Sequence, residues 1–244
     1  MFILKPYIFQ QFPEIIFGFS TKIGGNNNSD FGFNLSFSVG DHNSIVESNR
    51  SSFFKTIGLD DNSVAFQKQT HSDIIKIVDS PGNNGESDAL ITNKKHLGLA
   101  ITIADCTPIF IYDNKNKVIA GVHSGWRGTE KRILAKTLQT LVKKFNSNPQ
   151  HIFVYLGPSI SQMNYEVGKE VADKFDKKYR TTGNGKLFLD VSSVNYDTLL
   201  EFGIPKAQIQ KSDLCTFEFN SILHSHRRDQ EKSGRSLGVI AIKE

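Results

Sequence analysis

The chain has 244 residues, 38% hydrophobic and 22% charged, a composition typical of a globular protein with a substantial core. The net charge of +4 is small and the basic residues form no long run, so the sequence does not favour a nucleic-acid binder. No apolar stretch approaches the roughly 18 residues that a membrane-spanning helix needs.

Ten segments are predicted to be strands, because they are short, rich in β-branched residues and bounded by turn residues. They are 15–21, 63–69, 74–78, 88–93, 97–104, 108–113, 118–123, 151–157, 210–216 and 236–242. Asn114 and Asn116 suit the turn of a hairpin between the sixth and seventh of these segments. The Gly- and Asn-rich stretches 24–32, 80–87 and 180–185 are expected to be loops.

Four helices are predicted between the strands. One begins at Thr129, carries a stripe of leucines, and ends before Pro149. The others are expected over 43–57, 166–179 and 192–202. Because helices are interspersed with many strands and no long linker occurs, the sequence predicts one α/β (α+β) domain with mixed sheets over 1–244.

Three metal-binding side chains, His71, Cys106 and His123, stand at the ends of predicted strands. If those strands end at one rim of a sheet, the side chains converge. Two imidazoles and a thiolate suit Zn²⁺ and leave a fourth position open, as a catalytic zinc requires. Asp105 could accept a hydrogen bond from a ligating histidine. The competing interpretation is that Cys106 is simply a buried packing residue.

The run HSGWRGT after the strand 118–123 indicates an anion site. Ser124 and Gly125 allow close approach of a ligand to the backbone, Arg127 suits phosphate or carboxylate, and the following helix offers free N–H groups. Lys22 in GFSTKIGG is a further candidate. An ordinary turn with a solvated arginine explains HSGWRGT equally well. The basic stretch 224–236 is expected to be a solvated loop.

Several motifs together resemble one family: GFSTKIGG, QKQTH, ESDALIT, ADCTPIFIYD, AGVHSGWRGT and HSHRRDQEKSGR occur in the order of the laccase-domain or YfiH-like family. Members are also named polyphenol oxidases and purine nucleoside phosphorylases. The resemblance spans nearly the whole chain. It implies an α/β/β/α sandwich and a zinc site made of His71, Cys106 and His123. The family usually has arginine at Lys22 and an aromatic residue at His226, so contacts with phosphate and substrate are expected to differ there.

Among the activities that the resemblance implies, we favour zinc-dependent phosphorolysis of purine nucleosides, including methylthioadenosine, together with deamination of adenosine. Purine nucleosides and phosphate are then the partners. An open zinc lowers the pKa of bound water, which suits deamination. Seven histidines are too few for the four coppers of a multicopper oxidase, although Cu²⁺ could occupy the site in vitro.

Other functions stay open. One is a copper-dependent polyphenol oxidoreductase, and another is a metal-free amide hydrolase or deamidase with Cys106 as nucleophile and His123 or His71 as base. A binding module with structural zinc is disfavoured, because such sites usually have four protein ligands.

The expected location is the cytoplasm. Lys5 and Pro6 interrupt the apolar N-terminus before a signal-peptide core could form, and two cysteines make no disulfide framework. We expect a monomer or weak homo-oligomer with no membrane or nucleic-acid partner.

Overall fold

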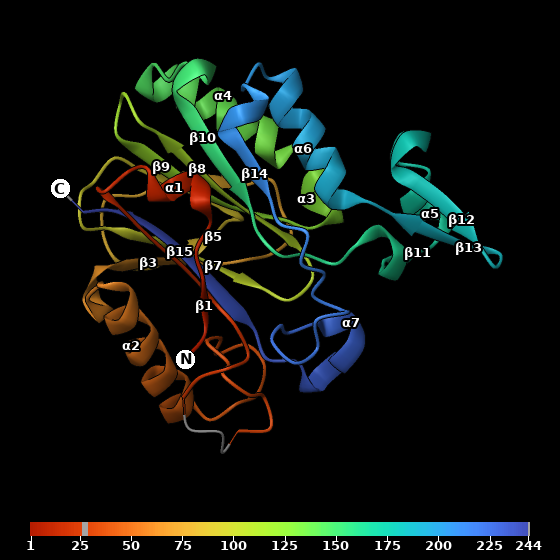
Figure 1. Cartoon of the computed structure of the whole chain (residues 1–244), viewed down its shortest axis with the longest axis horizontal. Coiled ribbons are helices and arrows are strands. Elements are labelled where there is room, and N and C mark those ends of the chain that lie inside the picture. Colours follow the sequence, from red (N-terminus) through yellow and green to blue (C-terminus); the bar gives the residue numbers. More distant parts are fainter. Residues whose placement is uncertain (26–28, 244) are drawn as a thin grey trace.

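The computed structural model describes residues 1–25 and 29–243, and two six-stranded sheets form its body (Figure 1). The first sheet comprises, in spatial order, β1 (Ile3–Leu4), β2 (Ile15–Ser20), β15 (Ser236–Ile242), β7 (Gly98–Ile103), β3 (Val64–Lys68) and β5 (Gly82–Glu86). The second comprises β14 (Ile209–Lys211), β10 (Ile152–Leu156), β8 (Thr107–Asp113), β9 (Val118–Ser124), β6 (Ala89–Thr92) and β4 (Ile75–Ile77). Both sheets mix parallel and antiparallel pairs, as predicted, and β8 and β9 form the expected hairpin.

The main core lies between the two sheets. Leu99 and Ile101 of β7 meet Phe110 and Tyr112 of β8 there, whereas Ala100 belongs to the apolar cluster on the outer face of the first sheet. Side chains alternate between the faces of a strand, so a strand covered on both faces is apolar throughout. This burial explains why the run LGLAITI shows no alternation of polar and apolar residues.

Helices cover the outer faces of both sheets. Helix α2 (Asn43–Ile57) packs on the first sheet, and α4 (Ile133–Phe145) and α6 (Val191–Glu201) pack on the second. The predicted α/β/β/α sandwich is therefore confirmed. The remaining helices are short: α1 (Tyr7–Gln10), α3 (Trp126–Glu130), α5 (Lys169–Ala172) and α7 (His226–Asp229). Within the described ranges, no helix has the length and apolarity to cross a membrane.

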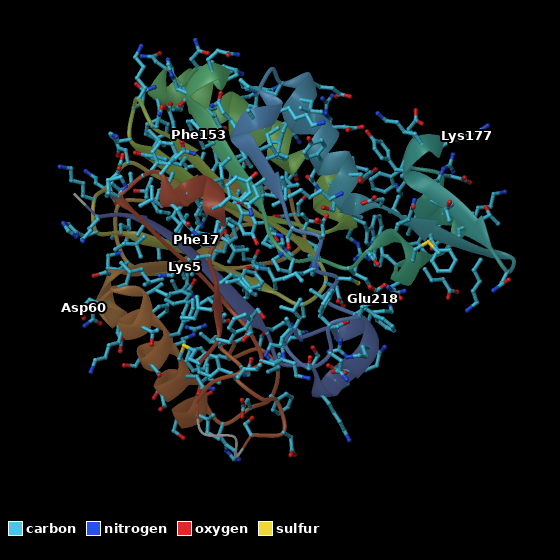
Figure 2. All side chains as sticks on the ribbon, in the orientation of Figure 1. Lys5, Phe17, Asp60, Phe153, Lys177 and Glu218 are labelled. Atoms are coloured by element: carbon cyan, nitrogen blue, oxygen red, sulfur yellow. The ribbon has the colours of Figure 1, made fainter. Side chains whose placement is uncertain are left out.

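A small three-stranded sheet projects from the body as an arm, with Lys177 near its far side (Figures 1 and 2). Its strands are β11 (Glu166–Val167), β13 (Lys186–Leu189) and β12 (Arg180–Gly183). The loop expected over 180–185 is in fact part of a hairpin. Its turn residues Asn184 and Gly185 have φ values of 51° and 73°, which is the backbone that an Asn-Gly hairpin turn adopts.

Two predicted helices differ from those observed. The helix expected from Thr129 is divided into α3 and α4, because Arg132 between them has a left-handed backbone (φ 63°). The helix expected over 166–179 is wrong, since strand β11 and the one-turn helix α5 occupy that segment. Its apolar residues, among them Val171 and Phe175, do share one cluster, so their spacing reflects common burial rather than a continuous helix.

Two other segments differ from the prediction, and part of a third lies outside the described residues. The loop expected over 80–87 contains β5, which pairs with β3 at the sheet edge despite its Gly and Asn content. The strand expected over 210–216 is shortened to β14. Of the loop expected over 24–32, residues 26–28 lie outside the described residues.

Candidate active site

The three predicted ligands meet at one end of the sandwich, where the chain passes between the two sheets. His71 lies in the connection from β3 to β4, and Cys106 lies in the connection from β7 to β8. His123 is the penultimate residue of β9 in the second sheet. We expected neighbouring strands of one sheet to bring these residues together. The convergence instead comes from two crossings between the sheets.

The ligand atoms of His71, Cys106 and His123 all lie within 4.8 Å of one another. Cys106 Sγ is 3.9 Å from His71 Nε2, and the two imidazole rings are tilted by 73° with centroids 5.0 Å apart. His123 is buried, Cys106 is half-buried and His71 is exposed. One ion could therefore be held from the protein side while its outer side faces solvent. Two imidazoles and a thiolate fit Zn²⁺ chemically.

Asp88, immediately before β6, contacts two of the predicted ligands from the buried side of the site. Its fully buried carboxylate lies 2.8 Å from His123 Nδ1 and accepts the backbone N–H groups of His71 and Ser72 at 3.1 and 2.6 Å. The Ser72 hydroxyl and the backbone N–H of Thr70 donate to it as well. A proton on His123 Nδ1 leaves the Nε2 lone pair free for a metal. Asp88 thus fixes both the His71 turn and the His123 ring.

The backbone around the site is closely fitted. His71 has φ 57° and Asp105, which precedes Cys106, has φ 89°, so both ligand-bearing turns use the left-handed region that non-glycine residues seldom adopt. A Cβ at Gly125 would lie 2.8 Å from Cys106 Sγ and 3.1 Å from His71 Cδ2. Only glycine leaves the ligands undisturbed at this position.

Cys106 and His123 form a charged pair. Burial raises the pKa of the Cys106 thiol. The positive charge of His123, the hydrogen bond from His123 and the nearby His71 lower this pKa by more than burial raises it, so that it falls to about 6. Burial lowers the pKa of His123, but the Cys106 thiolate and the Asp88 carboxylate raise it to about 9. The site without metal therefore holds a thiolate beside an imidazolium at neutral pH.

This pairing predicts how metal-free protein reacts with a thiol reagent. Because the pKa of Cys106 is lowered, its thiolate persists down to about pH 6 and is lost as the pH falls further. The rate of alkylation by iodoacetamide, followed by mass spectrometry, should be half-maximal near pH 6. An unperturbed thiol would give a midpoint near about 8.5. A midpoint at that ordinary value would contradict the charged pair.

The three predicted ligands open into a pocket of about 380 Å³ whose walls carry three arginines, Arg127, Arg227 and Arg235. Among the described residues, none of the three is ion-paired with a carboxylate. Trp126 and Tyr165 also line the pocket, and the guanidinium carbons of Arg127 and Arg227 lie 4.5 and 5.0 Å from their respective ring centroids. Arg227 and Arg235 each donate through Nη1 to backbone carbonyls, which leaves their positive charge uncompensated. Three guanidinium groups without a carboxylate partner favour an anionic ligand.

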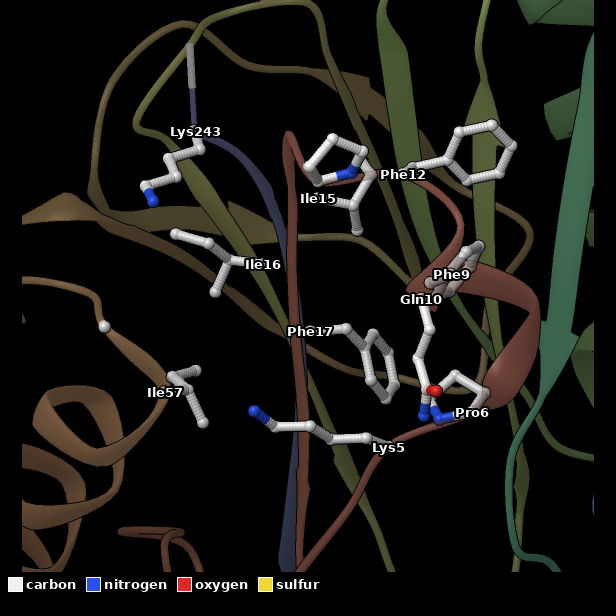
Figure 3. A pocket seen from close by; sticks show the side chains of 12 residues that line it. Lys5, Pro6, Phe9, Gln10, Phe12, Ile15, Ile16, Phe17, Ile57 and Lys243 are labelled. Carbon is white, nitrogen blue, oxygen red and sulfur yellow. The ribbon is translucent and has the colours of Figure 1, made fainter.

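A hollow of nearly equal size, about 370 Å³, lies between α1, β2 and the C-terminal end of α2 (Figure 3). Its walls are largely apolar, with Lys5 and Lys243 as its charged lining residues. None of the described residues that line it is a histidine, a cysteine or a carboxylic acid. The pocket at His71, Cys106 and His123 therefore differs from this hollow in the chemistry of its lining residues and not in its volume.

Several residues predicted to bind phosphate lie elsewhere or are already engaged. Lys22 does not line the pocket, and its ammonium donates to Asn220 at 3.3 Å. The buried Ser124 hydroxyl is bonded to Thr129 and Asn195. Helix α3 has five residues, too short to offer the extended anion-binding terminus expected there. Arg127 alone of the predicted anion ligands lines the pocket with its side chain.

Asp105 also differs from its expected role. The Thr216 hydroxyl and the Arg227 backbone N–H occupy its carboxylate oxygens, at 2.7 and 2.6 Å. It therefore ties the Cys106 turn to α7, while Asp88 is the carboxylate bonded to a ligating histidine. Residue spacing could not distinguish the two aspartates, because the distinction depends on which way each carboxylate points.

Sequence reasoning missed Asp88, Arg227 and Arg235. Asp88 stands directly before the fully buried strand β6, and a charged residue at such a position is an available signal. Arg227 and Arg235 fall in the stretch expected to be a solvated loop. The adjacent Arg228 is structural, because it donates to the carbonyls of residues 216, 217 and 223 and pairs with Asp229.

Known proteins are similar to this chain in sequence and fold along almost its whole length. The purine nucleoside phosphorylase YlmD of Bacillus subtilis is 33% identical over 95% of this chain and 90% of its own length. A purine nucleoside phosphorylase of Corynebacterium glutamicum is 32% identical over 91% and 92%. The crystal structure of the hypothetical protein YfiH of Bacillus licheniformis superposes with a TM-score of 0.91 at 31% identity, covering 99% of this chain and 96% of its own.

The family model described as multi-copper polyphenol oxidoreductase laccase matches residues 16–243, which include His71, Cys106, His123 and all three pocket arginines. The chain belongs to this laccase-like, YfiH-type family.

Proposed function

We propose that the protein is a zinc-dependent purine nucleoside phosphorylase that binds phosphate with Arg127, Arg227 and Arg235. The observation that carries the proposal is that these three arginines, none of which has a carboxylate partner among the described residues, share one pocket with His71, Cys106 and His123. The relatives in Bacillus subtilis and Corynebacterium glutamicum are named purine nucleoside phosphorylases, which supports this reaction. Adenosine deamination and methylthioadenosine phosphorolysis remain predictions for the same site.

The donor set supports the choice of metal. His71, Cys106 and His123 would hold Zn²⁺ with a fourth position toward the pocket, although Cu²⁺ would fit the same donors in vitro. A bound zinc ion would supply a Lewis acid that polarises an oxygen atom. Because Cys106 must stay a reduced thiolate, the proposal places the protein in a reducing compartment such as the cytoplasm.

In the proposed reaction a phosphate oxygen attacks C1′ of the ribose. The C1′–N9 bond breaks and its electron pair leaves with the purine. The hydrogen of the attacking monohydrogen phosphate passes to the purine, so the products are ribose 1-phosphate and the neutral free base. The guanidinium groups neutralise the phosphate dianion and fix its orientation. Trp126 and Tyr165 restrict the entry of water, which would compete with phosphate for C1′.

Arg127 offers the cleanest test of the phosphate site, because its side chain is exposed and stacks only on Trp126. Arg127→Gln should raise the KM for phosphate about 10- to 100-fold, as expected for loss of a charge-assisted contact, with a smaller change in the KM for inosine. Steady-state release of hypoxanthine measures both constants. Arg180→Gln, on the arm and paired with Asp173, is the matched control. An unchanged phosphate KM would remove Arg127 from the site.

A second function is favoured by one observation. The thiolate of Cys106, the imidazolium of His123 and the orienting carboxylate of Asp88 also form the arrangement of a cysteine hydrolase. Treatment with a chelator separates the two. Loss of phosphate-dependent hypoxanthine release on removal of zinc supports the phosphorylase. Catalysis that survives complete removal of metal but stops on thiol alkylation would establish the hydrolase.

A further inference from the structure

A second hollow, of about 420 Å³, adjoins the active-site pocket. Ser38, Gln69 and Thr102 line both, so these three residues form a wall that the two spaces share. The far part of this hollow is lined by Phe37, by Phe66 of β3 and by Arg50 of α2, among others. Nothing in the proposed phosphate site uses it.

Arg50 contacts a backbone carbonyl and two aromatic rings in this hollow. Its Nε donates to the carbonyl of Leu35 at 2.7 Å, and its guanidinium carbon lies 4.4 and 4.3 Å from the ring centroids of Phe37 and Phe66. Within the described chain, its terminal N–H groups have no hydrogen-bond acceptor. Since the rings and Leu35 occupy the rest of the group, these paired N–H donors are what Arg50 can offer to a ligand.

The charge of Arg50 is also uncompensated. No ion pair between described residues includes it, and burial alone lowers its pKa to about 10. A largely buried cation is costly unless it has an acceptor. Arg228, by comparison, is paired with Asp229 and three backbone carbonyls. An acceptor for Arg50 must therefore come from water or from a ligand.

A second donor in the same hollow lacks a partner. The Nε2 atom of Gln67 is buried and has no hydrogen-bond partner among the described residues, while its Oε1 accepts from Ser87 at 2.8 Å. The hollow thus combines the two terminal N–H groups of Arg50 with the aromatic side chain of Phe37, which is 44% exposed, and the buried Gln67 amide lies in its lining. A flat ligand with acceptors along one edge matches this lining better than a compact inorganic anion does.

Building on the proposed phosphorylase function, we propose that this hollow binds the purine base and that Arg50 donates its paired N–H groups to O6 and N7 of a 6-oxopurine. Arginine pairs with these two acceptors in bidentate fashion, whereas adenine offers one acceptor and one donor at the same edge. The ribose then lies at the shared wall and the phosphate beneath the three pocket arginines. As the C1′–N9 bond breaks, the purine gains negative charge, so the donors of Arg50 bind the departing base more strongly than the substrate.

The test compares inosine with adenosine in the zinc-loaded enzyme and in Arg50→Lys, which keeps the charge and the alkyl stem but loses the planar pair of donors. For Arg50→Lys, kcat/KM for inosine should fall about 10- to 100-fold and that for adenosine less than about 3-fold. The KM for phosphate should stay unchanged. Lys55→Gln, on an exposed position of α2, controls for charge on this helix.

Each other outcome is informative. Equal losses for both nucleosides, unchanged inosine kinetics, or an altered phosphate KM alone would overturn the purine assignment; the last would make the hollow an anion site. If Arg50→Lys fails a melting test, Phe37→Leu, which removes the ring against the guanidinium, should shift the inosine-to-adenosine ratio in the same direction. Hypoxanthine binding by calorimetry needs no turnover. If Arg50→Lys binds hypoxanthine more weakly than the wild type does, the subsite is supported. If the wild type also shows no phosphorolysis, the proposed function is refuted while the subsite assignment stands.

Discussion

Replacing Cys106 with alanine is expected to abolish stoichiometric zinc binding and phosphate-dependent release of hypoxanthine from inosine. Cys106 is the only thiolate among the three ligand side chains, whose ligand atoms lie within 4.8 Å of one another. Removing a partner of a ligand typically costs about 10- to 100-fold in metal affinity or activity, and removing a ligand itself should cost more. Plasma mass spectrometry of protein prepared without added copper measures the metal, and a coupled assay measures the base.

Cys215→Ala is the matched control for loss of a thiol. Cys215 is buried outside the pocket and accepts the backbone N–H of Ser161 at 3.3 Å, so its replacement should leave one zinc per chain. Cys106→Ala protein that retains full phosphorolysis would show that the reaction occurs elsewhere. Copper bound in place of zinc in the wild type, with turnover of phenols, would favour the oxidoreductase alternative.

Residue type and periodicity were enough to predict that His71, Cys106 and His123 converge and that one domain mixes helices with many strands, whereas the order of the four layers followed from the resemblance to the family. His71, Cys106 and His123 are chemically conspicuous at strand ends, and the apolar runs of β7 to β9 indicate strands buried on both faces. The helix predicted over 166–179 was wrong because residues that are buried in one apolar cluster happen to have helical spacing there. Periodicity reports which residues are buried, and it does not always report the backbone that buries them.

The supporting residues could not be predicted because their roles depend on orientation across long separations in the chain. Ser124 follows a ligand directly, yet its hydroxyl points to Thr129 and Asn195. Arg235 resembled part of a solvated loop, but the final strand carries it to the pocket wall. Arg50 lies in a surface helix, where an arginine is ordinarily solvated. Only the packed structure shows that its guanidinium is enclosed by two phenyl rings.

Replacing Asp88 with asparagine should weaken zinc binding about 10- to 100-fold and also lower the stability of the metal-free fold. Oδ1 of Asp88 contacts the backbone N–H of His71 and Nδ1 of His123, and Oδ2 accepts four bonds, from the backbone N–H and the hydroxyl of both Thr70 and Ser72. The asparagine amide has one oxygen where Asp88 has two. In either orientation its NH₂ group would therefore face N–H or O–H donors, from which it cannot accept a hydrogen bond. Each buried donor left unpaired costs about 1–3 kcal/mol, which predicts a total loss of about 2–5 kcal/mol.

The pH dependence gives this prediction an independent measurement. Burial raises the pKa of Asp88, but hydrogen bonds from His123 and Ser72 lower it more, to about 2. A carboxyl with a depressed folded-state pKa stabilises the fold above its unfolded pKa near 4, and the stabilisation is lost as the pH falls toward 2. Wild-type melting temperatures should therefore drop between pH 4 and 2 more steeply than those of Asp88→Asn. The exposed Asp79→Asn is the control. Parallel curves for wild type and Asp88→Asn, with equal zinc affinity, would mean that His123 needs no carboxylate to hold its position.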